Sequence, residues 1–327
     1  MELFQDIRGH EDIKKYFKKA IQTDKISHSY IFEGPKGVGK KMMAMSLAKA
    51  LLCQGEGRPC GKCKACTLVE AGTHPDIIKV DKDTRTTKID TIREQVVKNM
   101  DIKPYQGPYK IIIVTEADTV TIEGQNAMLK TIEEPPSYGM IILITENLAK
   151  LLPTIKSRCI QLRFNPLNQT QIMEYLQGCP ISEVQKEIYA QFAEGSIGTA
   201  KKLIEDEDFL EERKTSINYL LDLQKADLMQ MYNIQKSICE DKEFISSLLE
   251  FWLLWYRDLA ILKATGEGNL YYLDYKTHLL DMASKLTYNT IDRHIKLIKD
   301  ATMQINQNIY PTFVIENLLL KIKERKK

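Results

Sequence analysis

The sequence predicts an α/β domain built on a parallel sheet, followed by two helical domains. In its first half, short apolar runs alternate with helix-length segments, which is typical of parallel sheets. A glycine-rich loop separates the first apolar run from a helical run, as phosphate-binding α/β domains require. From residue 208 onward no segment has the pattern of a strand. We therefore expect domains at residues 1–165, 166–207 and 208–327.

Five segments are predicted to be strands of one sheet. Two of them are almost continuously apolar, which suits strands that are covered on both faces. The predicted strands are Tyr30–Glu33, Ile77–Val80, Lys110–Thr115, Met140–Thr145 and Cys159–Phe164. Helices are predicted to begin near Gly39, Thr87 and Thr121 and to cover Glu243–Lys263, Thr290–Gln307 and Pro311–Lys327.

The composition narrows the class of protein. The chain has 46 basic and 44 acidic side chains, a formal net charge of +2. Phosphate affinity needs concentrated positive charge, so this balance argues against tight DNA binding by the chain alone. Neither a signal peptide nor a membrane span is evident, and we expect a soluble, cytoplasmic protein. Seven cysteines in 327 residues do not form a disulfide scaffold, and a cluster of them in a reducing compartment indicates a metal.

The glycine-rich loop has the sequence GPKGVGKK at residues 34–41. Gly34, Gly37 and Gly39 would let backbone amides face phosphate oxygens at a helix N-terminus, and Lys40 would reach the β- and γ-phosphates. The next position needs a serine or threonine hydroxyl to ligate magnesium, but Lys41 stands there. The loop therefore predicts weak nucleotide binding or none. The alternative is a strand-to-helix turn that holds no ligand.

A second departure follows the third predicted strand. In active enzymes of this type an Asp-Glu pair stands at this point, the aspartate holding magnesium and the glutamate orienting the attacking water. Here Thr115 replaces the aspartate and Glu116 is retained. Two changed magnesium positions in separate segments predict a site that no longer hydrolyses nucleotide.

Four cysteines follow the phosphate loop with the spacing C-x6-C-x2-C-x2-C. They are Cys53, Cys60, Cys63 and Cys66. Tetrahedral zinc takes four soft ligands, and glycines and a proline between the cysteines supply the turns of such a knuckle. Four thiolates leave no open position for water, so the role would be structural. Because thiolates are soft ligands that also bind iron, the cluster could hold iron instead of zinc. The alternative is a loop with four free thiols.

Several stretches resemble one family. The run from Asn126 to Pro136 (NAMLKTIEEPP) resembles the NALLKxxEEP run of bacterial clamp-loader subunits, and Ser157-Arg158-Cys159 is identical to their Ser-Arg-Cys motif. The phosphate loop, the cysteine cluster and residues 71–76 (AGTHPD) occur in the same order. Over residues 4–203 the chain resembles an AAA+ clamp-loader subunit of bacterial DNA polymerase III. The resemblance implies a RecA-like sheet with an inserted zinc knuckle, a small helical lid domain and an all-α collar domain for oligomerisation.

The departures favour one role within that family. Its motor subunit, gamma/tau, has an intact phosphate loop, an Asp-Glu pair and a lid arginine in a Gly-Ser-x-Arg pattern. In this chain Gly198 takes the place of that arginine. Three departures predict a stator that does not hydrolyse ATP. A motor subunit that tolerates Lys41 and Thr115 is the alternative within the family. A zinc-dependent nucleic-acid binder is a third possibility, which the near-neutral charge argues against.

The resemblance assigns its most important role to Arg158. In the family this arginine enters the ATP site of a neighbouring subunit, where it contacts the γ-phosphate. An intramolecular salt bridge is the simpler alternative. The implied partners are the gamma/tau ATPase and the delta subunit and, through the assembled complex, the sliding clamp and primer-template DNA.

Two groups of apolar residues are expected to lie in the core. The helix that begins at Thr121 should turn Ile122, Met128, Leu129 and Ile132 inward. The aromatic group Phe251, Trp252, Trp255 and Tyr256 should lie in the core of the last domain or in a subunit interface.

Overall fold

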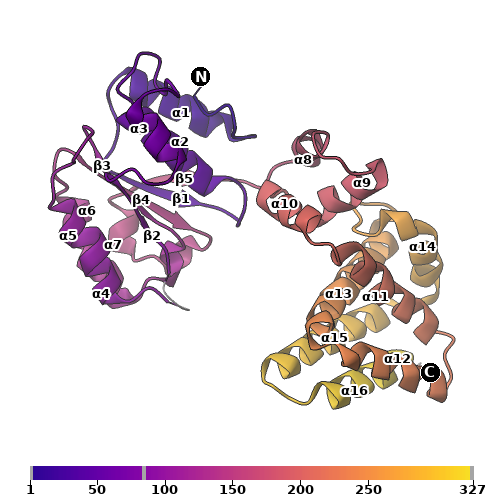
Figure 1. Ribbon diagram of the computed structural model, residues 1–327. Helices are drawn as coiled ribbons and strands as arrows, with labels where there is room; N and C mark the ends of the chain where they lie inside the picture. Colours follow the sequence, from indigo (N-terminus) through magenta and orange to yellow (C-terminus); the bar gives the residue numbers. More distant parts are fainter. Residues whose placement is uncertain (1–2, 83–85, 325–327) are drawn as a thin grey trace. The chain divides into compact units, whose positions relative to one another are not determined.

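The computed structural model describes residues 3–82 and 86–324 of the chain. It divides into two compact units, which are best followed separately in Figure 1. The first comprises Met1–Pro180 with Ala193–Lys201, and the second comprises Ile181–Phe192 with Lys202–Lys327. Helix α10 (Ile197–Glu205) runs from the first unit into the second. The domain boundaries that the sequence suggests remain predictions.

A five-stranded parallel sheet forms the centre of the first unit. Its strand order is β2-β3-β4-β1-β5. The strands are β1 (Ser29–Glu33), β2 (Ile77–Val80), β3 (Lys110–Val114), β4 (Gly139–Thr145) and β5 (Ile160–Arg163). All five predicted strands are confirmed, with ends that shift by one residue at most.

Helices cover both faces of this sheet, which explains the continuous apolar runs of β3 and β4. Tyr30 and Phe32 point to one face, where they pack with residues of α1, α2 and α3; Ile31 points to the other, with residues of α4, α6 and α7. The first group is α1 (Glu11–Gln22), α2 (Lys40–Leu52) and α3 (Lys64–Glu70). The second is α4 (Ile89–Ile92), the π-helix η1 (Arg93–Val97), α5 (Lys98–Met100), α6 (Ile122–Glu133) and α7 (Pro153–Lys156).

Shorter elements complete the first unit. Two are 3₁₀ turns, η2 (Ala117–Thr119) and η3 (Leu148–Lys150). The third is α8 (Gln169–Leu176), whose N-terminus has a capping box formed by Asn168 and Gln171.

Helix α6 starts at the expected point but turns a different face inward. The side chain of Thr121 caps it by accepting a hydrogen bond from the amide of Gly124 at 3.2 Å. Met128 and Ile132 are buried as predicted, whereas Ile122 is 62% exposed and its prediction is wrong. The reason is helical geometry: at about 100° per residue, Ile122 lies far around the helix from Met128 and Ile132.

The second unit is all helical and packs around α13. Its helices are α9 (Glu183–Phe192), α11 (Phe209–Leu223), α12 (Leu228–Glu240), α13 (Lys242–Thr265), η4 (Leu273–Tyr275), α14 (Lys276–Lys285), α15 (Tyr288–Asn306) and α16 (Pro311–Lys323). The three predicted helical segments of this region are confirmed as α13, α15 and α16. The final part of the last segment, residues 325–327, lies outside the described residues.

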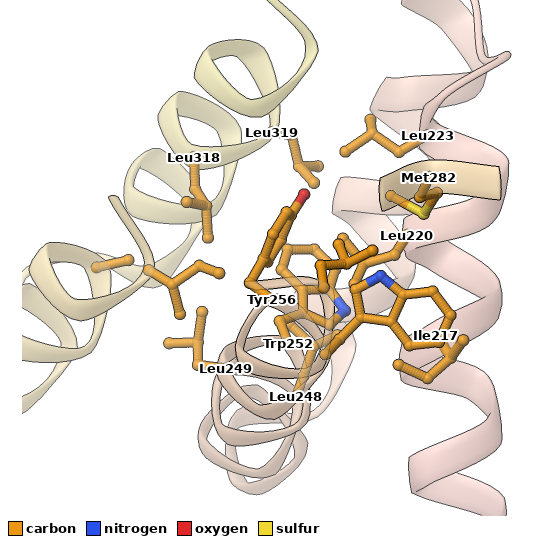
Figure 2. Close-up of a cluster of buried hydrophobic side chains, with 14 of the residues drawn as sticks. Ile217, Leu220, Leu223, Leu248, Leu249, Trp252, Tyr256, Met282, Leu318 and Leu319 are labelled. Atoms are coloured by element: carbon orange, nitrogen blue, oxygen red, sulfur yellow. The ribbon is translucent and has the colours of Figure 1, made fainter. Parts of the chain in front are cut away.

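The aromatic group of α13 forms the core of this unit (Figure 2). Trp252 and Trp255 are fully buried, and the indole of Trp252 donates a hydrogen bond to the carbonyl of Ser216 at 2.7 Å. The prediction of core packing is confirmed. Throughout the described part of the chain, every helix falls short of the length and apolarity that a bilayer span demands.

Candidate nucleotide-binding loop and metal centre

The glycine-rich loop connects β1 to α2, the context that phosphate-binding loops require. Gly34, Gly37 and Gly39 have φ angles of 150°, 75° and 102°, a region that side chains other than glycine rarely adopt. A Cβ atom on Gly34 would also lie 2.1 Å from the carbonyl oxygen of Phe164. The sequence therefore forms the tight loop that was predicted.

A cavity of about 370 Å³ opens beside this loop. Loop residues form one wall, and residues that follow the strands form the other. The latter are Asp81 after β2, Thr115 and Glu116 after β3, and Thr145 and Glu146 at the end of β4. The carboxyl ends of parallel strands meet at one edge of the sheet, which is where ligands bind in open α/β domains.

Lys40 bonds to the loop itself. The side chain is 6% exposed, and its Nζ donates to the carbonyl oxygen of Gly34 and, at 2.5 Å, to that of Pro35. Burial lowers the pKa of Lys40, although Glu146 and Asp118 act in the opposite direction. The ammonium group is thus satisfied by backbone carbonyls, and its contact with phosphates remains a prediction.

Lys41 and Thr115, the two departures from the magnesium-binding pattern, contact the same carboxylate. The hydroxyl of Thr115 donates to Asp81 Oδ1 at 2.7 Å, and Lys41 Nζ lies 3.5 Å from that oxygen. The Thr115 hydrogen bond and the Lys41 charge hold the pKa of Asp81 below its usual value. The two residues that stand in for magnesium ligands are therefore linked through Asp81.

Glu116 is likewise paired with lysines. Its carboxylate lies 2.6 Å from Lys82 Nζ and 3.9 Å from Lys36 Nζ. Both carboxylates, Asp81 and Glu116, already have ammonium partners, and the helix start offers Lys41 where a hydroxyl ligand is needed. The residues present do not fit a magnesium ion.

Gly198, at the position of the family's lid arginine, packs directly on the loop. Its amide donates to the carbonyl of Gly37 at 3.0 Å. A Cβ atom on Gly198 would lie 2.7 Å from the Cα of Gly37, closer than real contacts allow. The missing side chain thus lets the start of α10 pack against the phosphate loop.

The four clustered cysteines converge at the junction of α2 and α3. Their Sγ atoms all lie within 4.8 Å of one another, and the Cys53–Cys63 and Cys60–Cys66 pairs are each 4.0 Å apart. A tetrahedron of sulfurs about 2.3 Å from a zinc ion has edges of about 3.8 Å. None of the four is in a disulfide. The sulfur atoms therefore have the arrangement that a tetrahedral metal requires.

Backbone amides support thiolates in this cluster. The amides of Cys60, Cys63 and Cys66 point at the sulfurs of Cys53, Cys60 and Cys63, at 3.2, 3.3 and 3.5 Å respectively. Hydrogen bonds from the amides of Cys66 and Gln54 lower the pKa of the Cys63 thiol to about 6, whereas burial raises the pKa of the Cys66 thiol. Because metal ligation needs thiolates, this donor set fits zinc or another soft metal.

Arg158 lies in the turn between α7 and β5. Its Nε is 2.9 Å from Glu133 Oε1 at the end of α6, and its Nη1 donates to the carbonyl of Thr154 at 3.1 Å. The Arg158 side chain is 41% exposed. In this chain by itself the arginine thus forms the intramolecular salt bridge that was the simpler alternative. Exposed pairs of this kind contribute only about 0–1 kcal/mol, so Arg158 can exchange Glu133 for another anion.

Sequence reasoning did not find three polar residues of the cavity, Asp81, Thr145 and Glu146. Asp81 directly follows β2, and Thr145 ends β4, where its hydroxyl donates to Asp118 at 3.1 Å. These positions could have been found, because a polar residue at the carboxyl end of a parallel strand is a candidate ligand position.

The sheet, the loop and the polar strand ends together define an AAA+-like α/β domain with altered residues at the expected magnesium positions. The sequence profile of the family described as "DNA polymerase III, delta subunit" matches residues 9–168. Subunit delta' of DNA polymerase III from Bacillus subtilis is 30% identical over 95% of each chain. The chain belongs to the family of DNA polymerase III clamp-loader subunits that includes delta'.

Two further similarities agree with this family. The tau subunit of Escherichia coli DNA polymerase III is 33% identical over 62% of this chain, which corresponds to 32% of the tau chain. The solved structure of a DNA polymerase III gamma subunit-related protein from Thermotoga maritima has a TM-score of 0.50 and 18% identity, covering 95% of this chain and 99% of the other. At that identity the structure supports the fold alone.

Proposed function

We propose that this chain is the delta prime subunit of a bacterial DNA polymerase III clamp loader. It is a stator, which helps to load the sliding clamp onto primed DNA during replication without hydrolysing ATP. The observation that supports this proposal most directly is the contact of Lys41 and Thr115 with Asp81. These contacts put an ammonium group and a hydroxyl where a hydrolysing site needs a bound metal. Phosphoryl transfer depends on such a metal for charge stabilisation.

Arg158 is the residue through which this subunit acts on catalysis. It gives up its weak pair with Glu133 and enters the ATP site of a neighbouring gamma/tau subunit. An arginine supplied in trans accelerates phosphoryl transfer by about 10³–10⁵-fold. The planar guanidinium suits this role better than lysine because it can contact phosphate oxygens through two parallel hydrogen bonds.

The rest of the chain serves assembly. Residues 166–207 form the lid domain, and residues 208–327 form a collar that binds gamma/tau and delta. The sliding clamp and primer-template DNA are reached through the assembled complex. This proposal is supported by the match to a delta' subunit along nearly the whole chain. The complex works in the cytoplasm.

The cysteine cluster holds a structural zinc ion. Cys53, Cys60, Cys63 and Cys66 supply its four ligands, and the convergence of their sulfurs supports this assignment. When bound, zinc fixes the polar segment between α2 and α3, which has little apolar surface of its own to bury. It performs no chemistry, because four thiolates fill the coordination sphere.

A gamma/tau-like motor subunit is the second candidate. Two observations favour it: the 33% identity to a tau subunit, and the retained Lys40 and loop glycines. The two proposals predict different ATPase activities for the isolated chain: none for a stator, and turnover for a motor subunit.

The test compares steady-state ATP hydrolysis by the wild-type chain and its Lys40→Ala variant at saturating Mg-ATP. A stator shows no turnover in either protein above the rate in buffer. Turnover in the wild type that Lys40→Ala removes would establish the motor subunit and contradict the stator. Far-ultraviolet circular dichroism of both proteins controls for folding of the first unit, which contains Lys40.

A further inference from the structure

The second unit contains a larger cavity, of about 850 Å³, whose role the clamp-loader proposal leaves open. Residues of α11, α14, α15 and α16, together with Tyr256 of α13, line it. Leu220, Leu223 and Met282 give it an apolar wall, and they belong to the same core cluster as Tyr256 (Figure 2). This volume lies within the range of about 300–1,000 Å³ that is usual for small-molecule sites.

One buried polar side chain of this cavity has no hydrogen-bond partner. His294 is 3% exposed, and neither of its ring nitrogens is hydrogen bonded. Its ring contacts the ring of Tyr256 edge to face with centroids 5.0 Å apart. Tyr256 is 2% exposed, and Figure 2 shows its hydroxyl directed away from Trp252 and toward Leu319. Buried polar groups are almost always paired, so the two ring nitrogens of His294 indicate a missing partner.

The charges around the cavity are predominantly positive. Lys285, Arg293 and Lys323 line it, against the single carboxylate of Glu324; Lys285 is itself paired with Asp281 at 2.6 Å. Arg293 and Lys323 donate to backbone carbonyls, and among the described residues neither is paired with a carboxylate. Thr287, the N-cap of the 19-residue helix α15, also lines the cavity, so the positive end of that helix dipole faces it.

We propose that this cavity binds a small ligand with an anionic head group and an apolar body. The head accepts hydrogen bonds from His294 and Tyr256 beside Arg293, and the apolar body packs against Leu220, Leu223 and Met282. Burial lowers the pKa of His294 to about 4, so its ring is neutral and offers one N–H donor. A purely apolar ligand would leave the imidazole unpaired, and a purely ionic one would leave the leucines exposed.

Isothermal titration calorimetry of the full chain tests this proposal with three matched probes: nonanoate, octyl phosphate and octan-1-ol. Both anions share the alkyl body of the alcohol, and their difference shows whether a carboxylate or a phosphate head is preferred. We expect at least one anion to bind tenfold or more tightly than the alcohol. Equal binding of all three probes, or no binding, overturns the proposal.

Three variants test whether a loss of anion binding comes from the cavity itself or from a general change in charge or folding. Arg293→Gln and His294→Phe should each weaken binding of the preferred anion by tenfold or more, whereas Lys296→Gln, which removes a charge from the exposed side of α15, should not. Because His294→Phe removes unpaired buried nitrogens, it should also raise the Tm of the ligand-free protein by ~2–4 °C. This rise distinguishes loss of the site from misfolding. Unchanged anion binding in His294→Phe, or equal loss in Lys296→Gln, contradicts the assignment.

Discussion

At the scale of single residues, Arg158 has a partner that it can exchange. Both side chains of its ion pair with Glu133 are exposed, Arg158 by 41% and Glu133 by 40%. The energy of such a pair is small, whereas phosphate oxygens in a water-excluded site offer a guanidinium a much stronger contact. Glu133 therefore orients Arg158 in the free subunit without withholding it from a neighbour.

Glu133→Gln tests this view of the pair. Removing the carboxylate should lower the free energy of unfolding by less than about 1 kcal/mol, as for other exposed pairs. ATPase activity of the reconstituted loader should be unchanged or raised, because the competing anion is gone. Urea unfolding and a steady-state ATPase assay measure the two effects. A large fall in ATPase activity with assembly intact would mean that Glu133 is itself needed for the arginine's function.

His294 gives the stability of the chain a dependence on pH. Burial, with a smaller contribution from Arg293, lowers its pKa from 6.5 to about 4. Between these two values the unfolded chain takes up a proton that the folded chain does not, so stability falls as the pH is lowered. The loss is at most about 3 kcal/mol for this group.

The difference between wild type and His294→Phe isolates this contribution from other titrating groups. Urea unfolding should show the variant gaining stability relative to wild type as the pH falls from 6.5 to 4. A difference that does not change with pH would contradict a neutral, buried His294.

At the scale of elements, the start of α10 and the phosphate loop are fitted to each other. Gly37 and Gly198 meet backbone to backbone, and Ser196 also lies against Gly37. The sequence shows that the lid arginine is missing, but it does not show that the space for it is missing as well. That contact joins residues more than 150 positions apart, and no local pattern reports it.

Gly198→Ala should therefore destabilise the first unit. The new methyl group would meet the Cα of Gly37 at 2.7 Å, an overlap that costs about 1–3 kcal/mol in packed regions. Gly178→Ala is the matched control, because the nearest atom to a Cβ there is 3.6 Å away. Thermal unfolding of both variants provides the measurement. Equal stabilities would show that α10 does not pack on the loop as described.

The cysteine segment between α2 and α3 should depend on its metal. A ligand that binds only the folded state at a thousandfold its Kd stabilises that state by about 4 kcal/mol. We expect one zinc per chain, and a lower Tm after chelation under reducing conditions. Cys60→Ser should lose the metal, whereas Cys179→Ser, outside the cluster, should retain it. Metal content equal in both variants would contradict the four-thiolate site.

Most elements could be predicted because their signals are local. Short apolar runs that alternate with helix-length segments predicted all five strands, and helical spacing predicted α13, α15 and α16. The error at Ile122 came from assigning every apolar residue of α6 to one face, although the first residue of that helix points elsewhere. The grouping of α9 with the second unit was not predictable, since aromatic contacts such as Phe192 with Phe251 join distant segments.

The sequence alone shows which residues of the candidate site differ from the magnesium-binding pattern, but it does not show what those residues contact. Lys41 and Thr115 stand out in the sequence because each replaces a magnesium ligand. Their common contact, Asp81, depends on β2 and β3 being neighbours in the sheet. Likewise, the cysteine spacing indicated a metal, but only the fold brings the four sulfurs together.

At the scale of the whole molecule, an AAA+-like unit and an all-helical unit occur in one chain of the clamp-loader family. The first has a loop of the phosphate-binding type beside a cavity in which Asp81 and Glu116 are paired with lysines, and it exposes Arg158. On the proposed stator role, ATP hydrolysis would occur in neighbouring subunits, and this chain would contribute Arg158 to it.

The most direct test is the DNA- and clamp-stimulated ATPase rate of a reconstituted loader that carries Arg158→Ala in this chain. Arg163→Ala, at an exposed arginine of the neighbouring strand β5, is the matched control, and gel filtration checks assembly. We predict a fall of about 10³-fold or more at the dependent ATP site with Arg158→Ala and little change with Arg163→Ala. An unchanged rate with Arg158→Ala in an intact complex would contradict the account and leave this chain as a scaffold.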